Sequence, residues 1–244
     1  MATPPELRGP LPQIEIKNIK GWVADDCDLS LACRTMERKD LSMKLLDSTM
    51  APNPRRVRIF LAEKGIEVPV EQVDIGASEN RTAEFAAKNP MVNVPVLELD
   101  DGRYLSETVA ICRYFEGLHP NPPLMGVDAT DAGFVEMWNR RMEFELMNNI
   151  TGPFRHSHGF FKGRITQVPE WGEACRVAAL ERLAWLDGEL SDREFIAGDR
   201  FSIADITALC AIDFGAVSQI KIGPDQAHLQ RWHEDVSTRP SASA

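Results

Sequence analysis

The sequence lacks the paired cysteines that a disulfide framework, a zinc site or a thiol–disulfide active site requires. Its 244 residues include five cysteines, which is an odd number, and no two of them form a C-x-x-C pair. We therefore expect all the cysteines to be reduced and structural, and we expect no bound metal. They are Cys27, Cys33, Cys112, Cys175 and Cys210.

A basic face and a long hydrophobic run are also missing. The formal net charge is -10 and the pI is ≈ 5.1, which argues against binding to nucleic acid. The apolar stretches are far shorter than the roughly 20 residues of a membrane-spanning helix. The first residues, MATPPELRGPLPQ, do not have the charged-then-apolar layout of a secretory signal. Since 43% of the residues are hydrophobic, we expect a cytosolic globular protein with a substantial core.

The first 42 residues differ from the rest of the chain. Prolines are frequent in the first dozen positions, and the short apolar patches follow neither the helical nor the strand period. We interpret residues 1–42 as an N-terminal extension that is partly disordered.

The next stretch alternates strand-like and helix-like patterns. Asn53 before Pro54 predicts a helix with Asn53 as its N-cap, and Gly65 predicts its end. Asn89-Pro90 stops a second, shorter helix. The expected elements are a strand at residues 44–47, a helix from residue 53 to 65, a strand at 68–75 and a helix at 82–88.

The stretch from Asn93 to Phe115, NVPVLELDDGRYLSETVAICRYF, predicts a hairpin followed by a helix. Asp101-Gly102 is a strong turn signal between two apolar runs, and Ser106 is the expected start of the helix. Pro95 removes a ladder donor; if its peptide bond is cis, the main chain of Val94 is free to pair with a peptide ligand. The resulting order, βαβαββα, predicts a thioredoxin-like domain over residues 43–118. It has no catalytic dithiol, because the loop that would hold one reads APNP.

The second half predicts a helical domain. Residues 119–126, which include HPNPP, form a Pro-rich linker, and residues 127–240 carry apolar side chains at helical spacing. Ser202 and Asp205 fit a capping box at a helix start. We expect long helices near residues 130–147, 173–190 and 202–217.

Taken in this order, the motifs resemble those of the cytosolic glutathione transferases. The similarity covers about residues 43–240 and includes VPVLELDDG, SET, the Pro-rich linker and GDRFSIADI. The segments APNPRRVRIFLAEKGI and NRRMEFELMNNITGPFRHSH are similar to an atypical, fungal-type branch. Members of that branch lack the usual Tyr, Ser or Cys activator and use a bound water that a Ser and a His hold.

The resemblance implies a function. It predicts a homodimeric detoxification enzyme that uses glutathione as its co-substrate and conjugates the glutathione thiolate to small apolar electrophiles. A glutathione-dependent lyase, dehalogenase, isomerase or peroxidase remains an alternative, because the same thiolate serves each reaction. A non-catalytic scaffold is a further alternative, which the retained Val94-Pro95, Glu107 and Thr108 argue against.

The resemblance also assigns roles in glutathione binding. Glu107 would pair with the γ-glutamyl ammonium, and Thr108, at a helix start, would bind the γ-glutamyl carboxylate. The main chain of Val94, before Pro95, would pair with the cysteinyl amide as an added strand does. Arg81 is the candidate cation for the glycine carboxylate. Considered singly, Glu107 and Arg81 are equally consistent with solvated charges at helix starts.

Thiol activation is the open part of the prediction. Ala51 stands where many relatives carry a hydroxyl, so stabilisation of the thiolate would come from the terminus of the helix at Asn53 and from a further donor. Thr151 and His156 are the leading candidates, as the pair that would hold a water.

Alternatives remain at each of these positions. Arg155 stands at the other candidate offset for the histidine, and Ser48 or Thr49 could supply a direct hydroxyl. Met147, Phe154 and Phe161 could line an apolar pocket for the electrophile, although aromatic side chains at helical spacing are more often core.

Overall fold

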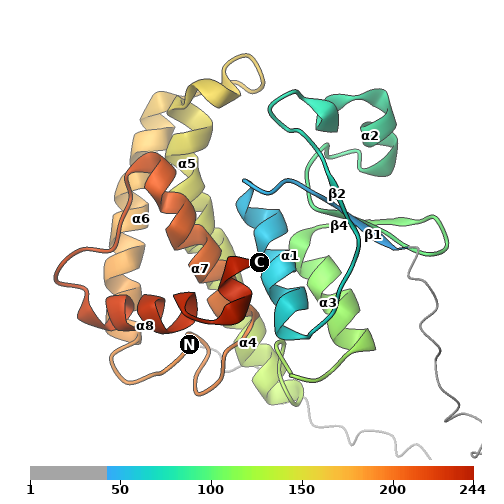
Figure 1. The fold of residues 1–244 in the computed structure, drawn as a ribbon. Helices are drawn as coiled ribbons and strands as arrows, with labels where there is room; N and C mark the ends of the chain where they lie inside the picture. The colour runs from blue at the N-terminus through green and yellow to red at the C-terminus, as the bar shows by residue number, and fades with distance from the viewer. Residues whose placement is uncertain (1–42) are drawn as a thin grey trace, which may run out of the picture. The chain divides into compact units, whose positions relative to one another are not determined.

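The computed structural model describes residues 43–244 of the chain. The predicted extension over residues 1–42 therefore lies outside the described residues, together with Cys27 and Cys33. Within the described part, a four-stranded sheet with three helices precedes a group of longer helices (Figure 1).

The first half contains the following elements in chain order. They are β1 (Lys44–Asp47), α1 (Pro52–Glu63), β2 (Val70–Gln72), the 3-10 turn η1 (Glu79–Arg81), α2 (Ala83–Lys88), β3 (Val96–Glu98), β4 (Tyr104–Ser106) and α3 (Thr108–Leu118). This is the predicted βαβαββα order, so the thioredoxin-like fold is confirmed.

The second half is helical, as predicted. Its elements are α4 (Ala129–Arg141), the π-helical segment η2 (Met142–Met147), α5 (Asn148–Ser157), η3 (Gly159–Phe161), α6 (Pro169–Glu189), α7 (Ile203–Gly215), η4 (Ala216–Ser218), α8 (Ala227–Ser237) and η5 (Pro240–Ser243).

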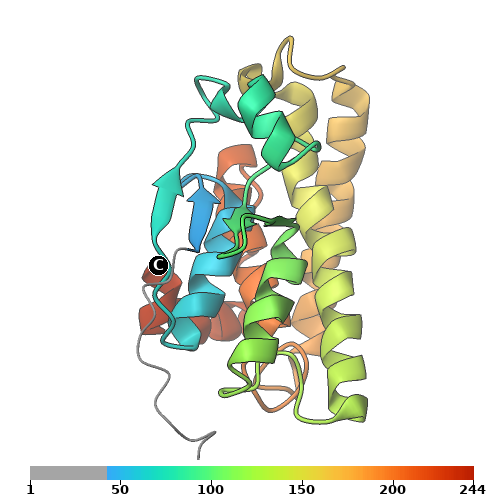
Figure 2. The same ribbon diagram turned by 90° about the vertical axis from the view of Figure 1, so that its right-hand side faces the viewer.

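The sheet is mixed, with strand order β2-β1-β3-β4. β1 pairs with β2 in parallel and with β3 antiparallel, and β3 and β4 form an antiparallel hairpin. Successive side chains of a strand point to opposite faces. Leu45 and Leu97 accordingly belong to the main core with α1 and α3, whereas Leu46 and Val96 pack with Phe85 of α2. Figure 2 shows α1 and α3 side by side and α2 apart from them.

The start of α1 differs from the prediction. Ala51 is the N-cap, and Pro52 is the first helical residue, so Asn53 lies inside the first turn and does not cap the helix. Two prolines are tolerated there because the first N–H groups of a helix have no partner within it, and proline presets the helical φ. The end of α1 was predicted correctly, since Gly65 adopts a φ of 64° just beyond it.

The start of α3 also differs. Ser106 is still part of β4, Glu107 is the N-cap with a φ of 72°, and Thr108 is the first helical residue. The predicted hairpin is present: Leu99 N–H donates to the carbonyl of Arg103, and Gly102 has a φ of 80°. The second strand is shorter than expected, because only Val70–Gln72 pairs with β1.

Two of the three long helices predicted in the second half are longer than the sequence suggested, and the third, α7, is slightly shorter. α4, η2 and α5 follow one another without a break, so the chain stays helical through Gly152-Pro153 to Ser157. α6 starts at Pro169. The predicted capping box at the start of α7 is present, with Ser202 and Asp205 each bonding to the main chain of the other.

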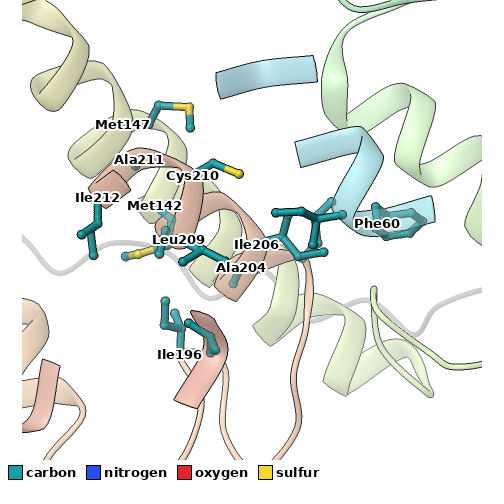
Figure 3. Packing of buried hydrophobic residues seen from close by; sticks show 14 of the residues in the cluster. Phe60, Met142, Met147, Ile196, Ala204, Ile206, Leu209, Cys210, Ala211 and Ile212 are labelled. Carbon is teal, nitrogen blue, oxygen red and sulfur yellow. The ribbon is translucent and has the colours of Figure 1, made fainter. Parts of the chain in front are cut away.

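One continuous core joins the two halves. α7 is buried on almost all sides, and Figure 3 shows its labelled side chains between Phe60 of α1 and the methionines of η2, Met142 and Met147. An apolar helix without a polar face is expected at the centre of such a core. α1 and α7 are therefore packed together, which sets the N-terminal end of α1 against the helical half.

The other end of α1 is anchored by polar contacts. The buried Lys64 ammonium donates to the carbonyls of His119 and Pro122 at 2.7 Å each and pairs with Glu116 at 2.7 Å. Glu63 accepts two bonds from the Arg239 guanidinium, at 2.8 and 2.7 Å. These contacts hold the linker and the C-terminal segment on α1.

Candidate functional site

The sheet brings three of the predicted segments to one edge. β3 and β4 pair Val96 with Ser106, so Val94-Pro95 and Glu107-Thr108 occur together at the open end of the hairpin. β1 and β3 pair Leu46 with Val96, so the residue two positions beyond Leu46, which is Ser48, approaches the same end. Sequence positions 48, 94 and 107 thus meet at the edge where α1 also begins.

The main chain of Val94 is available for pairing. The Val94–Pro95 peptide bond is cis, as the sequence prediction required, and no hydrogen bond to the Val94 main chain occurs within residues 43–244. The loop before it is held by side-chain amides. Asn89 donates to the Asn93 carbonyl at 2.8 Å, and Asn80 donates to the carbonyl of Val92 at 2.6 Å. The loop can therefore present an edge to an extended peptide.

Glu107 and Thr108 form the start of α3. Glu107 is exposed, and its carboxylate has no ion pair among the described residues. Its φ of 72° is in the left-handed region, which costs about 1–3 kcal/mol for a residue other than glycine and is concentrated at ligand sites. The N-terminus of α3 offers free N–H groups and a positive dipole end beside Thr108. The Glu107 carboxylate, which can bind a cation, therefore lies next to the N-terminus of α3, which can bind an anion.

The N-terminus of α1 offers fewer donors than a helix usually does. Ala51 N–H already donates to the carbonyl of Ser48 at 2.9 Å, Pro52 and Pro54 have no N–H, and Arg55 N–H points to Ala51 O at 3.4 Å. Asn53 N–H is the one free main-chain donor in this turn among the described residues. A thiolate at this terminus would need a second donor from a side chain.

The loop between β1 and α1 is fixed by the buried Asp47. Its carboxylate accepts from Arg58 at 2.6 Å and from the side-chain amide of Gln72 at 2.7 Å, and the side-chain oxygen of Gln72, Oε1, accepts from the Thr49 hydroxyl at 2.9 Å. The Thr49 proton is therefore in use. Ser48 is 7% exposed, and its hydroxyl makes no hydrogen bond within the described residues, so its proton is free.

Arg81 is the last residue of the 3-10 turn η1, which follows β2. It is exposed, and one of its guanidinium nitrogens donates to the Arg164 carbonyl at 3.2 Å. Arg164 in turn donates to the carbonyls of Ile75 and Gly76 at 2.6 Å each. The loop between α5 and α6 thus reaches across to the first half, at the end where α2 lies (Figure 1).

Thr151 and His156 lie on different faces of α5. A separation of five residues corresponds to about 140° around a helix. His156 Nδ1 accepts from Val168 N–H at 3.2 Å, whereas Thr151 is one turn from Met147, whose sulfur lies 3.8 Å from Arg56 Nη1 of α1. Thr151 therefore shares a helix face with Met147, which contacts α1, whereas His156 lies on a different face.

Arg155 shares the face of Thr151, because it follows one turn later. Beside it the structure assembles an aromatic cluster that the sequence suggested only in part. The rings of Phe160, Phe161 and Phe214 all lie 5.2–5.7 Å from the ring of Phe154. All four rings are partly exposed, whereas Met147 of the predicted pocket is buried at the contact with α1.

The cysteines offer no alternative nucleophile in the described part of the chain. Cys112, Cys175 and Cys210 are free and buried. Burial raises the pKa of Cys112 and of Cys210 to about 12, so both thiols are neutral near pH 7.

Residues 43–244 contain neither a candidate metal-binding cluster nor a candidate membrane-spanning helix. No three His, Cys, Asp or Glu side chains come together there as a metal ion would require. None of the helices in this part combines the length and the apolar character that a membrane crossing needs.

In the sequence, Ser48 and Thr49 are equivalent candidates for a free hydroxyl in this loop. The register of β1 against β3 points to Ser48, because Ser48 follows β1 by one residue and β1 pairs with β3. Thr49 is equally polar, but its hydroxyl already donates to the side-chain oxygen of Gln72.

Comparisons with known proteins agree with this architecture. The model of the glutathione S-transferase N-terminal domain matches residues 51–118, and that of the C-terminal domain matches residues 150–240. Glutathione S-transferase 2 of Saccharomyces cerevisiae is 34% identical over 209 residues, which are 84% of this chain and 90% of the yeast protein.

Solved structures are similar over the same range. The crystal structure of Gtt2 from Saccharomyces cerevisiae superposes with a TM-score of 0.79 at 34% identity and covers 82% of this chain and 98% of the yeast chain. A glutathione S-transferase domain-containing protein of Marinobacter aquaeolei gives 0.78 at 39% identity, over 81% of this chain and 98% of that chain. A Sulfitobacter homologue with bound glutathione shares the fold, with a TM-score of 0.70 at 17% identity, over 82% of this chain and 95% of that one.

Proposed function

The chain belongs to the glutathione S-transferase family, and on that premise we propose that it conjugates the thiolate of glutathione to small electrophiles with an apolar body. The observation that carries the proposal is the convergence of the free Val94 main chain, Glu107 and the start of α3 at one sheet edge. These groups match the cysteinyl amide, the γ-glutamyl ammonium and the γ-glutamyl carboxylate in kind and in order. A scaffold protein would not need all three.

In this proposal each charged end of glutathione has its own partner. Glu107 pairs with the ammonium, and Thr108, with the N–H groups of α3, binds the adjacent carboxylate. Val94 pairs with the cysteinyl main chain as a neighbouring strand would. Arg81 binds the glycine carboxylate with the guanidinium N–H groups that Arg164 does not use.

The sulfur then lies at the N-terminus of α1, where we propose two donors. Asn53 N–H supplies the first, and the free hydroxyl of Ser48 supplies the second. Ala51 leaves room beside them, because its side chain is a single methyl group. Thr151 supports a second possibility, since it lies on the face of α5 that continues from the contact between Met147 and Arg56. Its hydroxyl oxygen can accept from a water that donates to the thiolate.

The proposal includes a cytosolic homodimer with a role in detoxification. Phe134 on α4 and Phe144 on η2 are each 55% exposed, and helical spacing places them on one stripe with Met137. Exposed aromatic side chains on one stripe are typical of a protein interface. A second copy of this chain is the partner that the family pattern suggests.

Calorimetry followed by a rate assay tests the function. Glutathione should bind with measurable heat, and cysteinylglycine, which lacks the γ-glutamyl group, should bind much more weakly. Conjugation of 1-chloro-2,4-dinitrobenzene should then exceed the uncatalysed rate. Peroxide, haloacid and isomerase substrates in the same assay identify the alternative reactions. An absence of binding heat with glutathione would rule out the proposed function and favour a scaffold.

A further inference from the structure

We propose that the electrophile of this site carries an aromatic ring and an anionic group, and that Arg155 pairs with the anion while the phenylalanine cluster packs against the ring. The cluster consists of Phe154, Phe160, Phe161 and Phe214. The inference rests on the proposed function and narrows it to a substrate class. Three observations support it.

The first observation places the cluster beside the reacting sulfur. Phe154 packs edge-to-face on Phe214 of α7, with centroids 5.3 Å apart. The neighbour of Phe214, Asp213, accepts a 2.6 Å hydrogen bond from Arg55 in the first turns of α1. Since the thiolate is proposed to lie at that end of α1, the cluster is close to where an electrophile must bind.

The second observation concerns the rings. Phe154 and Phe161 meet at 80° with centroids 5.2 Å apart, and Phe160 and Phe161 meet at 81° with centroids 5.1 Å apart. Each ring keeps part of its surface exposed. Aromatic pairs in this edge-to-face arrangement are worth about 0.5–1.5 kcal/mol beyond the area that they bury. The aromatic ring of a bound electrophile could therefore pack against the cluster in the same edge-to-face arrangement.

The third observation concerns the partners of the two arginines that contact the cluster, Arg164 and Arg155. Arg164 has guanidinium donors already engaged, because it donates to the carbonyls of Ile75 and Gly76, and its guanidinium lies 4.3 Å from the Phe160 centroid. Arg155 is exposed and has no carboxylate partner among the described residues; its guanidinium lies 5.5 Å from the Phe161 centroid. A planar guanidinium at the edge of an aromatic cluster suits a carboxylate on an aromatic ring.

Because the whole chain is negatively charged, a preference for an anionic electrophile depends on positive groups close to the site. At a formal net charge of -10, the long-range field repels anions and gives no general advantage to an acidic substrate. Any preference for an anionic electrophile must therefore come from a cation within a few ångströms of it. Of the two arginines that contact the aromatic cluster, Arg155 is the one whose guanidinium makes no hydrogen bond within the described residues.

The test compares two electrophiles of nearly the same shape, the anionic 4-chloro-3,5-dinitrobenzoate and the neutral 4-chloro-3,5-dinitrobenzamide. In both, the thiolate attacks the carbon that bears chlorine, a C–S bond forms, and chloride leaves with the electron pair of the broken C–Cl bond. The parent protein should prefer the benzoate, and Arg155→Met should lower the ratio of kcat/KM values for benzoate over benzamide about 10-fold. Arg155→Lys should restore part of the ratio. The KM for glutathione should not change.

Lys162→Met is the matched control, because it removes the same charge from an exposed position in the loop that follows α5, the helix that carries Arg155. The control should leave the ratio unchanged, and added salt should reduce the ratio in the parent. An unchanged ratio in Arg155→Met, with both electrophiles still turned over, overturns the inference and leaves the proposed function intact. A higher KM for glutathione without a change in the ratio assigns Arg155 to the tripeptide and also overturns it. If the parent neither binds glutathione nor turns over either compound, the proposed function fails and the inference fails with it.

Discussion

The hydroxyl of Thr151 donates a 2.9 Å hydrogen bond to the carbonyl oxygen of Met147, one turn earlier in the same helical run. Its proton is therefore committed, and Thr151 can act on a thiolate only through a water that donates to its oxygen. Ser48 has its proton free. The two residues thus correspond to two different ways of activating the thiol, which mutation can separate.

For Ser48→Ala we expect the pKa of bound glutathione to rise by about 1 unit, which corresponds to about 1.4 kcal/mol of lost thiolate stabilisation. Thr49→Ala is the matched control, because that hydroxyl already donates to Gln72. The ultraviolet absorbance of the thiolate, titrated against pH in the glutathione complex, measures the shift. His156→Ala should titrate like the parent, since His156 faces Val168. An upward shift in Thr151→Ala alone would favour the water-mediated route instead.

Substitutions of Ala51 test two properties together: the space beside the proposed sulfur position and the capping of α1. A hydroxyl introduced by Ala51→Ser can accept from Asn53 N–H at the N-cap, so we expect the variant to be more stable to unfolding by about 0.5–1 kcal/mol. Ala51→Leu fills the space beside the sulfur and should abolish turnover more completely than Ala51→Ser. Thermal unfolding and kcat measure the two effects. Equal turnover in the two variants would show that the space at Ala51 is not used.

Glu107→Ala should weaken glutathione binding by about 1–3 kcal/mol, because it removes a charge-assisted hydrogen bond to the ammonium. Isothermal titration measures the change. Glu181→Ala removes an exposed carboxylate from α6 and serves as the control. Identical affinities for the parent and Glu107→Ala would remove Glu107 from the site. The substitution should not relieve the backbone strain at φ of 72° and so should not offset the lost binding energy, since alanine adopts that region no more easily than glutamate.

The exposed stripe of Phe134 and Phe144 predicts the oligomeric state. We expect the parent to be a dimer at micromolar concentration and Phe134→Glu or Phe144→Glu to be monomeric, because a carboxylate would be buried without a partner in the interface. Light scattering measures the mass. Val177→Glu, at an exposed apolar position of α6, is the control and should remain a dimer. A monomeric parent would contradict the prediction.

Asp213 links α7 to α1 and to α8 and should make stability depend on pH. Burial alone would raise its pKa, but hydrogen bonds from His233 and Arg55 hold the pKa below the ordinary value of 3.8. A carboxyl group with a lowered folded pKa contributes stability above its ordinary value and loses it as pH falls through the folded value.

Asp213→Asn should therefore reduce the free energy of unfolding by about 1–3 kcal/mol at neutral pH, and the difference should shrink as the pH falls below 3.8, the ordinary pKa of this carboxyl group. Urea unfolding at both pH values measures this. Asp235→Asn, on the exposed face of α8, is the control. A difference from the parent that is the same at both pH values would show that the ionised carboxylate is not responsible.

Much of the fold could be predicted because its signals are local. The strand at Lys44–Asp47, the capping box of Ser202 and Asp205 and the turn at Gly102 each depend on residues close together in the chain. The start of α1 was missed by two residues, because Asn53-Pro54 and Ala51-Pro52 offer competing cap signals. The length of the α4–η2–α5 run was also missed. Gly152-Pro153 breaks an isolated helix, but here the run is buried between α6 and α7.

The sequence by itself determined the element order, the family and the identity of the groups that could meet glutathione, because these follow from residue types at short spacing. Only the tertiary structure decided which hydroxyl is free, which side of the α4–η2–α5 run continues from the contact between Met147 and Arg56, and where the aromatic cluster forms. Ser48 and Thr49 are chemically alike in the sequence, and Gln72 on a neighbouring strand distinguishes them. Such choices depend on contacts between residues far apart in the chain, which the packing of strands and helices alone creates.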